Sequence, residues 1–312
     1  MPEPAHLPVL LAEVLEGLAL HGAPGLWVDG TLGRAGHAEA ILERTAPGGR
    51  LVGIDRDEDA LLAAGERLGR RFAGRYELHR GNFSEMTAWL PPASCDGVLL
   101  DLGVSSPQLD TAERGFSFLR DGPLDMRMDR RQPLTAEGLV NSLGATELAD
   151  IFWKFGEEPA SRRIARAIEA ERRVRPIRTT AQLASLVERV CPRGGRRAHP
   201  ATRVFQALRI VVNDEGRSLS SGLAAACSLL KPGGRLAVIT FHSLEDRAVK
   251  DFGNERSRDY VFDGPVDVPE LRRPKVPELR WLRRKATMPS EAELESNPRA
   301  RSAQLRVLEK LP

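Results

Sequence analysis

Short apolar runs alternate with longer amphipathic stretches through the first hundred residues, and one more such run follows near residue 235. Most of these runs are largely aliphatic, continuous and of strand length, which is typical of strands buried on both faces of a parallel sheet. The runs lie at 26–29, 51–55, 76–79, 97–101 and 235–241. This alternation predicts an α/β fold with a doubly wound, mostly parallel sheet.

The stretch between Asp101 and Arg235 exceeds 130 residues, which is too long for a single crossover connection. Its apolar positions recur at helical spacing in two groups: Leu148, Ile151 and Phe152, then Ile164, Ala165 and Ile168. A capping box formed by Thr179 and Gln182 predicts the start of a further helix. The sequence therefore predicts a helical subdomain inserted into the sheet domain.

We expect residues 1–110 and 206–312 to form the sheet domain and 111–205 to form the inserted, mainly helical subdomain. A long helix over 209–230 would lead back to the sheet. Alternating segments at 281–287 and 302–308 predict two antiparallel closing strands, which makes a seven-stranded sheet.

Charge is distributed unevenly along the chain. The formal net charge is +3, but residues 1–110 hold nine arginines, no lysine and 16 acidic side chains, so the basic excess lies after residue 110. Such an excess indicates a polyanionic partner for the later segments, although an arginine-rich composition alone also accounts for it.

Cysteine usage and hydropathy exclude several classes of protein. Cys95, Cys191 and Cys227 lack C-x-x-C spacing, so we expect neither a disulfide framework nor a metal site. No apolar run reaches membrane-spanning length, and the first 20 residues lack a signal-peptide pattern. We expect a cytoplasmic protein without a membrane partner.

The candidate chemistry begins at a glycine-punctuated turn over 28–37. Gly30, Gly33 and Gly36 permit positive φ and close approach of a ligand to the backbone, although such a turn also serves as a plain tight connection. Asp55 ends the second expected strand, where an acidic residue accepts hydrogen bonds from ribose. The glycine spacing differs from G-x-G-x-x-G and resembles that of class I S-adenosylmethionine methyltransferases, with an NAD-dependent oxidoreductase as the alternative.

Five further motifs help to decide between a methyltransferase and an oxidoreductase. They lie at 101–110 (DLGVSSPQLD), 114–118 (RGFSF), 122–128 (GPLDMRM), 199–203 (HPATR) and 241–247 (FHSLEDR). Together with the glycine loop they closely resemble the bacterial ribosomal RNA small subunit methyltransferase H family, of MraW type, over essentially the whole chain.

The resemblance implies a class I, Rossmann-like S-adenosylmethionine-dependent methyltransferase. It also implies the reaction, transfer of a methyl group to the exocyclic N4 of a cytosine in the P-site region of 16S ribosomal RNA. The cofactor would be S-adenosylmethionine, and the partner 16S rRNA in the small ribosomal subunit. An RNA-binding assembly factor that keeps the fold without the activity is the non-enzymatic alternative.

The family's cofactor contacts, carried over position by position, fall on Ala35, Gly36, His37, Asp55, Phe83, Asp101 and Gln108. The family usually has glycine at the position of Ala35, so a positive φ there would strain the loop. Phe83 would stack on adenine unless it is a core residue. His37 would contact the cofactor through its backbone or its ring.

Three residues are candidates for catalysis at the cytosine amine: Asp101, Ser105 and His242. The amine lone pair is delocalised into the ring, and a hydrogen-bond acceptor would favour its attack. Asp101 is the best-placed acceptor, but the Pro-Pro-aromatic motif common in amino methyltransferases is absent here, which leaves the acceptor oxygen open. His242 is a substrate contact or a structural histidine.

Arginines gather in the inserted segment. Candidates for contact with RNA phosphates are Arg162, Arg166, Arg173, Arg196, Arg197 and Arg203, because guanidinium groups pair well with phosphate oxygens. The alternative is a solvated helix face without a partner.

Overall fold

The computed structural model describes residues 8–20, 24–194, 199–262 and 266–312. The chain divides into two compact units. The sheet unit comprises Met1–Gly103 and Arg217–Pro312, and the helical unit comprises Val104–Gly216. Each is described by itself.

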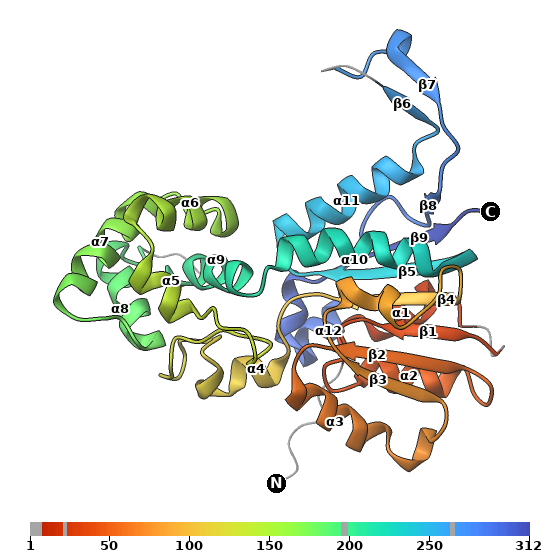
Figure 1. Cartoon of the computed structure of the whole chain (residues 1–312), viewed down its shortest axis with the longest axis horizontal. Coiled ribbons are helices and arrows are strands. Elements are labelled where there is room, and N and C mark those ends of the chain that lie inside the picture. The colour runs from red at the N-terminus through yellow and green to blue at the C-terminus, as the bar shows by residue number, and fades with distance from the viewer. Residues whose placement is uncertain (1–7, 21–23, 195–198, 263–265) are drawn as a thin grey trace. The chain divides into compact units, whose positions relative to one another are not determined.

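The sheet unit contains a seven-stranded sheet in the order β3-β2-β1-β4-β5-β9-β8 (Figure 1). Its strands are β1 (Leu26–Asp29), β2 (Arg50–Asp55), β3 (Tyr76–Arg80), β4 (Cys95–Asp101), β5 (Leu230–Thr240), β8 (Leu279–Trp281) and β9 (Gln304–Lys310). The first five pair in parallel, while β9 runs antiparallel to both β5 and β8. This confirms the class I methyltransferase fold, in which the strand order reverses direction between β1 and β4.

Alternating side chains fill the cores on the two faces of this sheet. Trp27, Leu51 and Leu99 pack with α1 (Leu11–Gly17), α2 (Gly36–Arg44) and α3 (Glu58–Leu68). Val28, Val52 and Val98 point the other way, toward α10 (Glu215–Leu229) and α11 (Ser243–Ser257). Strands buried on both faces explain why the sequence shows continuous apolar runs rather than alternation.

The end of the sheet unit differs from the prediction. The expected strand at 281–287 is wrong, since β8 ends at Trp281 and Thr287 makes only an isolated bridge to Leu305. Three consecutive basic residues, 283–285, cannot alternate between a buried and a solvated face. Further elements of this region are a small sheet of β6 (Tyr260–Phe262) and β7 (Arg272–Pro274), which stands beyond α11 in Figure 1, and the helix α12 (Glu291–Ser296).

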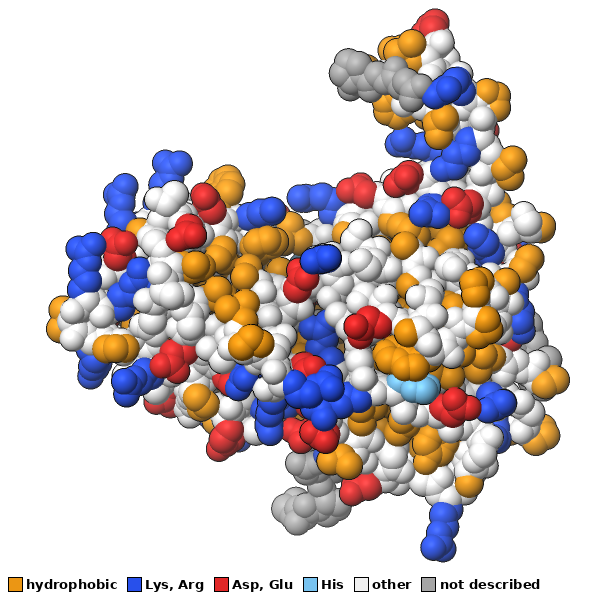
Figure 2. Space-filling model, viewed as in Figure 1, with side chains coloured by type: hydrophobic (Ala, Val, Ile, Leu, Met, Phe, Trp, Pro, Cys, Tyr) orange, Lys and Arg blue, Asp and Glu red, His pale blue; other side chains and the backbone are white. Residues whose placement is uncertain are grey.

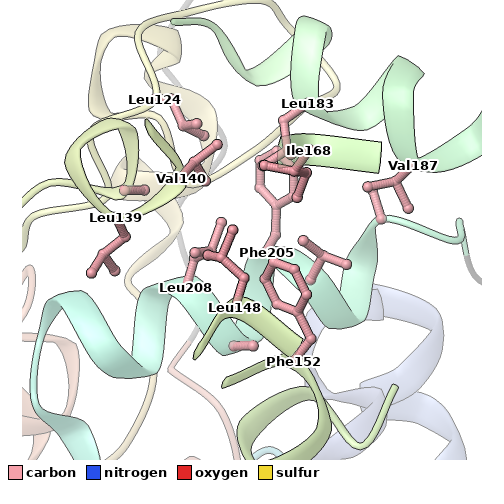
Figure 3. Close-up of a cluster of buried hydrophobic side chains, with 14 of the residues drawn as sticks. Leu124, Leu139, Val140, Leu148, Phe152, Ile168, Leu183, Val187, Phe205 and Leu208 are labelled. Atoms are coloured by element: carbon pink, nitrogen blue, oxygen red, sulfur yellow. The ribbon is translucent and has the colours of Figure 1, made fainter. Parts of the chain in front are cut away.

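The helical unit has a core of its own (Figure 3). Its helices are α4 (Ser106–Asp110), α5 (Ala136–Ser142), α6 (Ala145–Gly156), α7 (Ser161–Val174), α8 (Thr180–Val190) and α9 (Thr202–Val212). The predicted faces are buried, with Leu148 and Phe152 from α6 and Ile164 and Ile168 from α7 in this core. The capping box of Thr179 and Gln182 at the start of α8 is also confirmed.

The helical unit extends beyond the expected 111–205, because Val104 and Leu109 at one end and Val212 at the other pack into its core. The single helix expected over 209–230 is instead two helices, α9 and α10. The break lies where the Asn213 amide is held by Met126 O and Met128 N, at 2.8 Å each. Asp214 follows with a positive φ of 48°, which ends α9.

The three cysteines are buried and unbonded to one another. Among the described residues, no helix combines the length and apolar character needed to cross a membrane.

Candidate active site

Three carboxylates lie at the carboxyl ends of neighbouring strands, Asp29 on β1, Asp55 on β2 and Asp101 on β4. Asp29 pairs in register with Gly53 and Leu99, so Asp55 and Asp101 each stand two residues further along their strands. This edge is where open α/β sheets bind their ligands, at the point where the strand order reverses. The fold therefore builds an acidic edge, by which we mean these three carboxylates.

The glycine loop needs its glycines either for close packing or for an unusual backbone conformation. A Cβ on Gly30 would lie 2.6 Å from the Leu100 side chain, and one on Gly36 would lie 2.5 Å from Pro8. Gly33 has a positive φ of 50°. Ala35, which precedes α2, has φ 58° and ψ 29°, so the expected strain is present: the left-handed region costs a residue with a Cβ roughly 1–2 kcal/mol.

Asp55 ties the loop to β2. Its Oδ2 accepts a hydrogen bond from the Gly33 amide at 2.9 Å, and its Oδ1 accepts one from the Asp57 amide, also at 2.9 Å. Burial raises the Asp55 pKa to about 6, against the lowering effect of these two amides. Each oxygen keeps a second lone pair, so the carboxylate can still accept a hydroxyl hydrogen bond.

Asp29 is a functional candidate that sequence reasoning missed. It is 1% exposed, accepts a hydrogen bond from the Thr31 amide at 3.2 Å, and has its pKa raised to about 7, chiefly by burial and further by the charge of Asp55. Its signal in the sequence was a carboxylate at the end of an apolar run, directly before Gly30. A buried carboxylate of this kind is stabilised by a bound cation.

Asp101, at the end of β4, has one carboxyl oxygen without a hydrogen-bond partner among the described residues. Its Oδ1 is buried and has no hydrogen-bond partner among the described residues, while its backbone amide donates to Thr31 Oγ1 at 2.6 Å. Burial, then the charges of Asp29 and Glu245, raise its pKa well above the ordinary value. A buried carboxyl oxygen without a partner is a site where a bound ligand can supply the hydrogen-bond donor.

His37 stands opposite Asp101 as a neutral ring. Its Nε2 lies 2.9 Å from Val9 O, and because a carbonyl only accepts, Nε2 carries the proton. Burial lowers the His37 pKa to about 4. The 3.7 Å separation between its Nδ1 and Asp101 Oδ2 is therefore not an ion pair at neutral pH.

Phe83 follows β3, and its ring is packed on one side. A Cβ on Gly222 of α10 would lie 2.3 Å from that ring. Asn82 and Ser218 join the same two elements by a hydrogen bond of 2.7 Å. The ring is partly buried and packs against the core of the sheet unit, and stacking on adenine stays a prediction.

The remaining candidates for catalysis have clear local roles. His242 caps α11, where its Nδ1 accepts from the Glu245 amide at 3.4 Å. Its Nε2 is 3.1 Å from Glu245 Oε1 but lacks hydrogen-bond geometry with it. In the helical unit, Gln108 Oε1 accepts from the Ser105 amide at 3.0 Å at the start of α4. Contact of these residues with cofactor or substrate stays a prediction.

The predicted RNA-binding arginines differ in their surroundings. Arg162 and Arg166 are exposed on α7 and have no side-chain partner among the described residues. Arg173 pairs with Glu169 at 3.3 Å, and Arg203 donates to Glu157 O at 3.0 Å. Arg196 and Arg197 lie outside the described residues.

Two further arginines of the helical unit are candidates for RNA binding that sequence reasoning missed. Figure 2 shows other Lys and Arg side chains at the surface of this unit. Arg175 and Arg189 line a cleft of about 340 Å³ between α7 and α8, and Arg189 is paired with Glu171 across it at 3.1 Å. The run of arginines over 172–178 was the available signal.

The chain is similar in sequence to proteins of one known family. The model of the MraW methylase family matches residues 3–311. The chain belongs to the MraW methylase family. A protein from Xanthomonas campestris named ribosomal RNA small subunit methyltransferase H is 51% identical, covering 99% of this chain and 89% of the relative. One of the same name from Syntrophotalea carbinolica is 52% identical, with 98% of each chain covered. A solved putative rRNA-methylase from Clostridium thermocellum is similar at 10% identity, with a TM-score of 0.46 and 98% of each chain covered.

S-adenosylmethionine is the cofactor of the MraW methylase family, and the acidic edge fits it. The cofactor carries a positive sulfonium and a ribose diol. Burial raises the pKa of both Asp29 and Asp101, so a cation bound beside them would favour their ionised forms. Asp55 retains lone pairs for hydroxyl groups, and Asp101 Oδ1 lacks a donor from the described residues. The NAD-dependent alternative is thereby set aside.

Asp55→Ala is expected to weaken S-adenosylmethionine binding about tenfold or more, because a hydrogen bond to a charged group contributes roughly 1.5–3 kcal/mol. Isothermal titration calorimetry measures this directly. Asp59→Ala, on the exposed face of α3, is the matched control and should bind as the wild type does. Equal affinities for all three proteins would remove Asp55 from the site.

Proposed function

We propose that this chain transfers a methyl group from S-adenosylmethionine to the exocyclic N4 of a cytosine in the P-site region of 16S rRNA. The observation that carries the chemistry is the buried, unpartnered Oδ1 of Asp101 at the acidic edge. The target is supported by the resemblance of the motifs and by relatives named as small subunit rRNA methyltransferases over nearly the whole chain.

The chemistry requires an acceptor next to a weak nucleophile. When bound, S-adenosylmethionine supplies an electrophilic methyl group. Methyl transfer would form an N–C bond and break the C–S bond, whose electron pair would stay on sulfur, and one amine proton would have to leave. Asp101 Oδ1 would accept a hydrogen bond from the amine N–H, and in its ionised form this carboxylate would take the departing proton.

The helical unit would bind the RNA. Arg162 and Arg166 are one helical turn apart on α7, exposed and without a side-chain partner among the described residues, so neither has to break an ion pair to meet a phosphate. Arg173 and Arg203 would have to exchange or share their present partners. The pair on α7 is therefore the better place to test the interface.

Reversing Arg162 and Arg166 to glutamate together is expected to weaken RNA binding about tenfold at low salt and to make its salt dependence shallower, since fewer counterions are released on binding. Filter binding to a 16S rRNA fragment over a salt series measures both effects. Reversal of Arg44 and Arg70, on the sheet unit, makes the same change in net charge and serves as the control. If both double variants lose affinity equally, general charge and not an α7 interface explains the binding.

The proposed reaction is tested with purified protein, radiolabelled S-adenosylmethionine and small ribosomal subunits from cells that lack the modification. We expect label in 16S rRNA, and mass spectrometry of the digested RNA should identify N4-methylcytidine. Label in a different nucleoside would overturn the N4 assignment. RNA binding without any transfer would instead indicate an assembly factor.

A further inference from the structure

The segment Pro8–Leu10 is clamped between two parts of the sheet unit that are far apart in sequence. On one side, Pro8 lies against Gly36 at the start of α2. On the other, the Leu10 amide donates a hydrogen bond of 2.7 Å to Glu293 Oε1 on α12. Leu10 is fully buried and has a positive φ of 53°, so its conformation is one that the backbone does not prefer and that surrounding contacts must hold.

This clamp matters because of the carbonyl between the two anchors. Val9 O receives the Nε2 proton of His37 at 2.9 Å. That contact fixes the tautomer, and it leaves Nδ1 unprotonated at 3.7 Å from Asp101 Oδ2. A rotated Val9 carbonyl would release the ring and would let the proton move to Nδ1, where it would face the Asp101 carboxyl.

The position of Glu293 is itself fixed, so it can hold the peptide between Val9 and Leu10 in place. Its backbone amide donates to Ser290 Oγ at 3.2 Å, which caps α12 and fixes the first turn of that helix. Its side chain is half-buried, whereas Glu291 and Glu295 on the same helix are exposed. Glu293 is thus the acidic residue of α12 that is placed to act on the N-terminal segment.

We propose that Glu293 is a positioning residue of the cofactor site: by binding the Leu10 amide it holds the Val9 carbonyl, and through it keeps His37 as a neutral Nε2–H tautomer beside Asp101. The inference rests on the proposed function only in taking the acidic edge as the S-adenosylmethionine site. It assigns a part in cofactor binding to α12. None of the hydrogen bonds described joins α12 directly to the acidic edge.

The test uses three variants of the full chain. Glu293→Met keeps the length of the side chain but removes the acceptor. Glu293→Gln keeps an acceptor oxygen and should rescue. Glu295→Met makes the same change on the exposed face of α12 and is the control.

Two readouts are taken without RNA. By calorimetry, Glu293→Met should bind S-adenosylmethionine about five- to tenfold more weakly than the wild type, while the other two variants bind normally. In nitrogen-15 spectra of histidine-labelled protein, His37 should show a single Nε2–H tautomer in the wild type and in Glu293→Gln, and a mixture of tautomers in Glu293→Met.

Wild-type affinity together with an unchanged His37 spectrum in Glu293→Met would overturn the inference. So would a Glu293→Gln variant as impaired as Glu293→Met, because that result would assign the effect to charge and not to the hydrogen bond. Since neither readout involves RNA, an error in the cytosine N4 assignment would leave both results unaffected. Should the wild type itself fail to bind S-adenosylmethionine, the His37 spectra would still decide whether Glu293 sets the tautomer.

Discussion

Asp101→Ala is expected to slow methyl transfer by about two to three orders of magnitude, the usual cost of removing one preorganised electrostatic contact to a reacting group. The variant deletes the buried oxygen that has no other partner among the described residues. The measurement is a single-turnover reaction with labelled S-adenosylmethionine and small ribosomal subunits, with the cofactor at saturation so that weaker binding does not contribute.

The fold should survive this change, because removing a carboxyl that is buried next to Asp29 relieves repulsion. A melting temperature at or above that of the wild type would confirm that the loss is chemical. Asp150→Ala, on the exposed face of α6, is the control for any general effect of losing an acidic side chain. Transfer by Asp101→Ala within tenfold of the wild-type rate would eliminate Asp101 as the amine acceptor.

Asp29→Asn is expected to stabilise the cofactor-free protein by about 2–4 kcal/mol at pH 8 and hardly at all near pH 4, since a tenfold change in an ionisation constant corresponds to about 1.4 kcal/mol. The folded-state pKa of Asp29 is raised from 3.8 to about 7. Below the unfolded-state pKa the carboxyl is protonated in both states, so it does not change the free energy of unfolding. As the pH rises toward about 7, the carboxyl ionises in the unfolded state but stays protonated in the folded state, so the free energy of unfolding of the wild type falls. Asparagine stays neutral and keeps an oxygen for the Thr31 amide.

Urea unfolding at about pH 4, close to the unfolded-state pKa, and at about pH 8, above the folded-state pKa, measures this difference. Trp153 is the one tryptophan of the helical unit, so a Trp153→Phe background makes the fluorescence report on the sheet unit alone. The gain of the asparagine variant should grow between these two pH values. A gain of the same size at both would show that ionisation of Asp29 is not its cause.

Much of the fold could be predicted because its signals are local. The strands that end at Asp29, Asp55 and Asp101 are short aliphatic runs, and the helix faces of the inserted segment follow a period that any short window reveals. The positions of Asp55 and Asp101 at the ends of strands were likewise predicted, from acidic residues that follow apolar runs, and their part in cofactor binding stays a prediction.

What the sequence did not reveal depends on contacts between distant residues. The Leu10–Glu293 hydrogen bond joins residues 283 positions apart, and nothing around either residue indicates the other. The break between α9 and α10 arises because Asn213 is bound by the backbone of Met126 and Met128, which overrides a locally helical pattern. The burial that perturbs Asp29 and His37 is also a property of the packed molecule.

The helical unit leaves the sheet after β4 and the chain returns to it at β5, and these two strands are direct neighbours. An insertion at such a junction interrupts no hydrogen-bonded ladder and leaves every acidic strand end in place. Evolution can therefore exchange or enlarge the helical unit, which we propose binds the RNA, while the sheet unit is inherited intact. One ancestral scaffold could in this way have given rise to enzymes for very different targets.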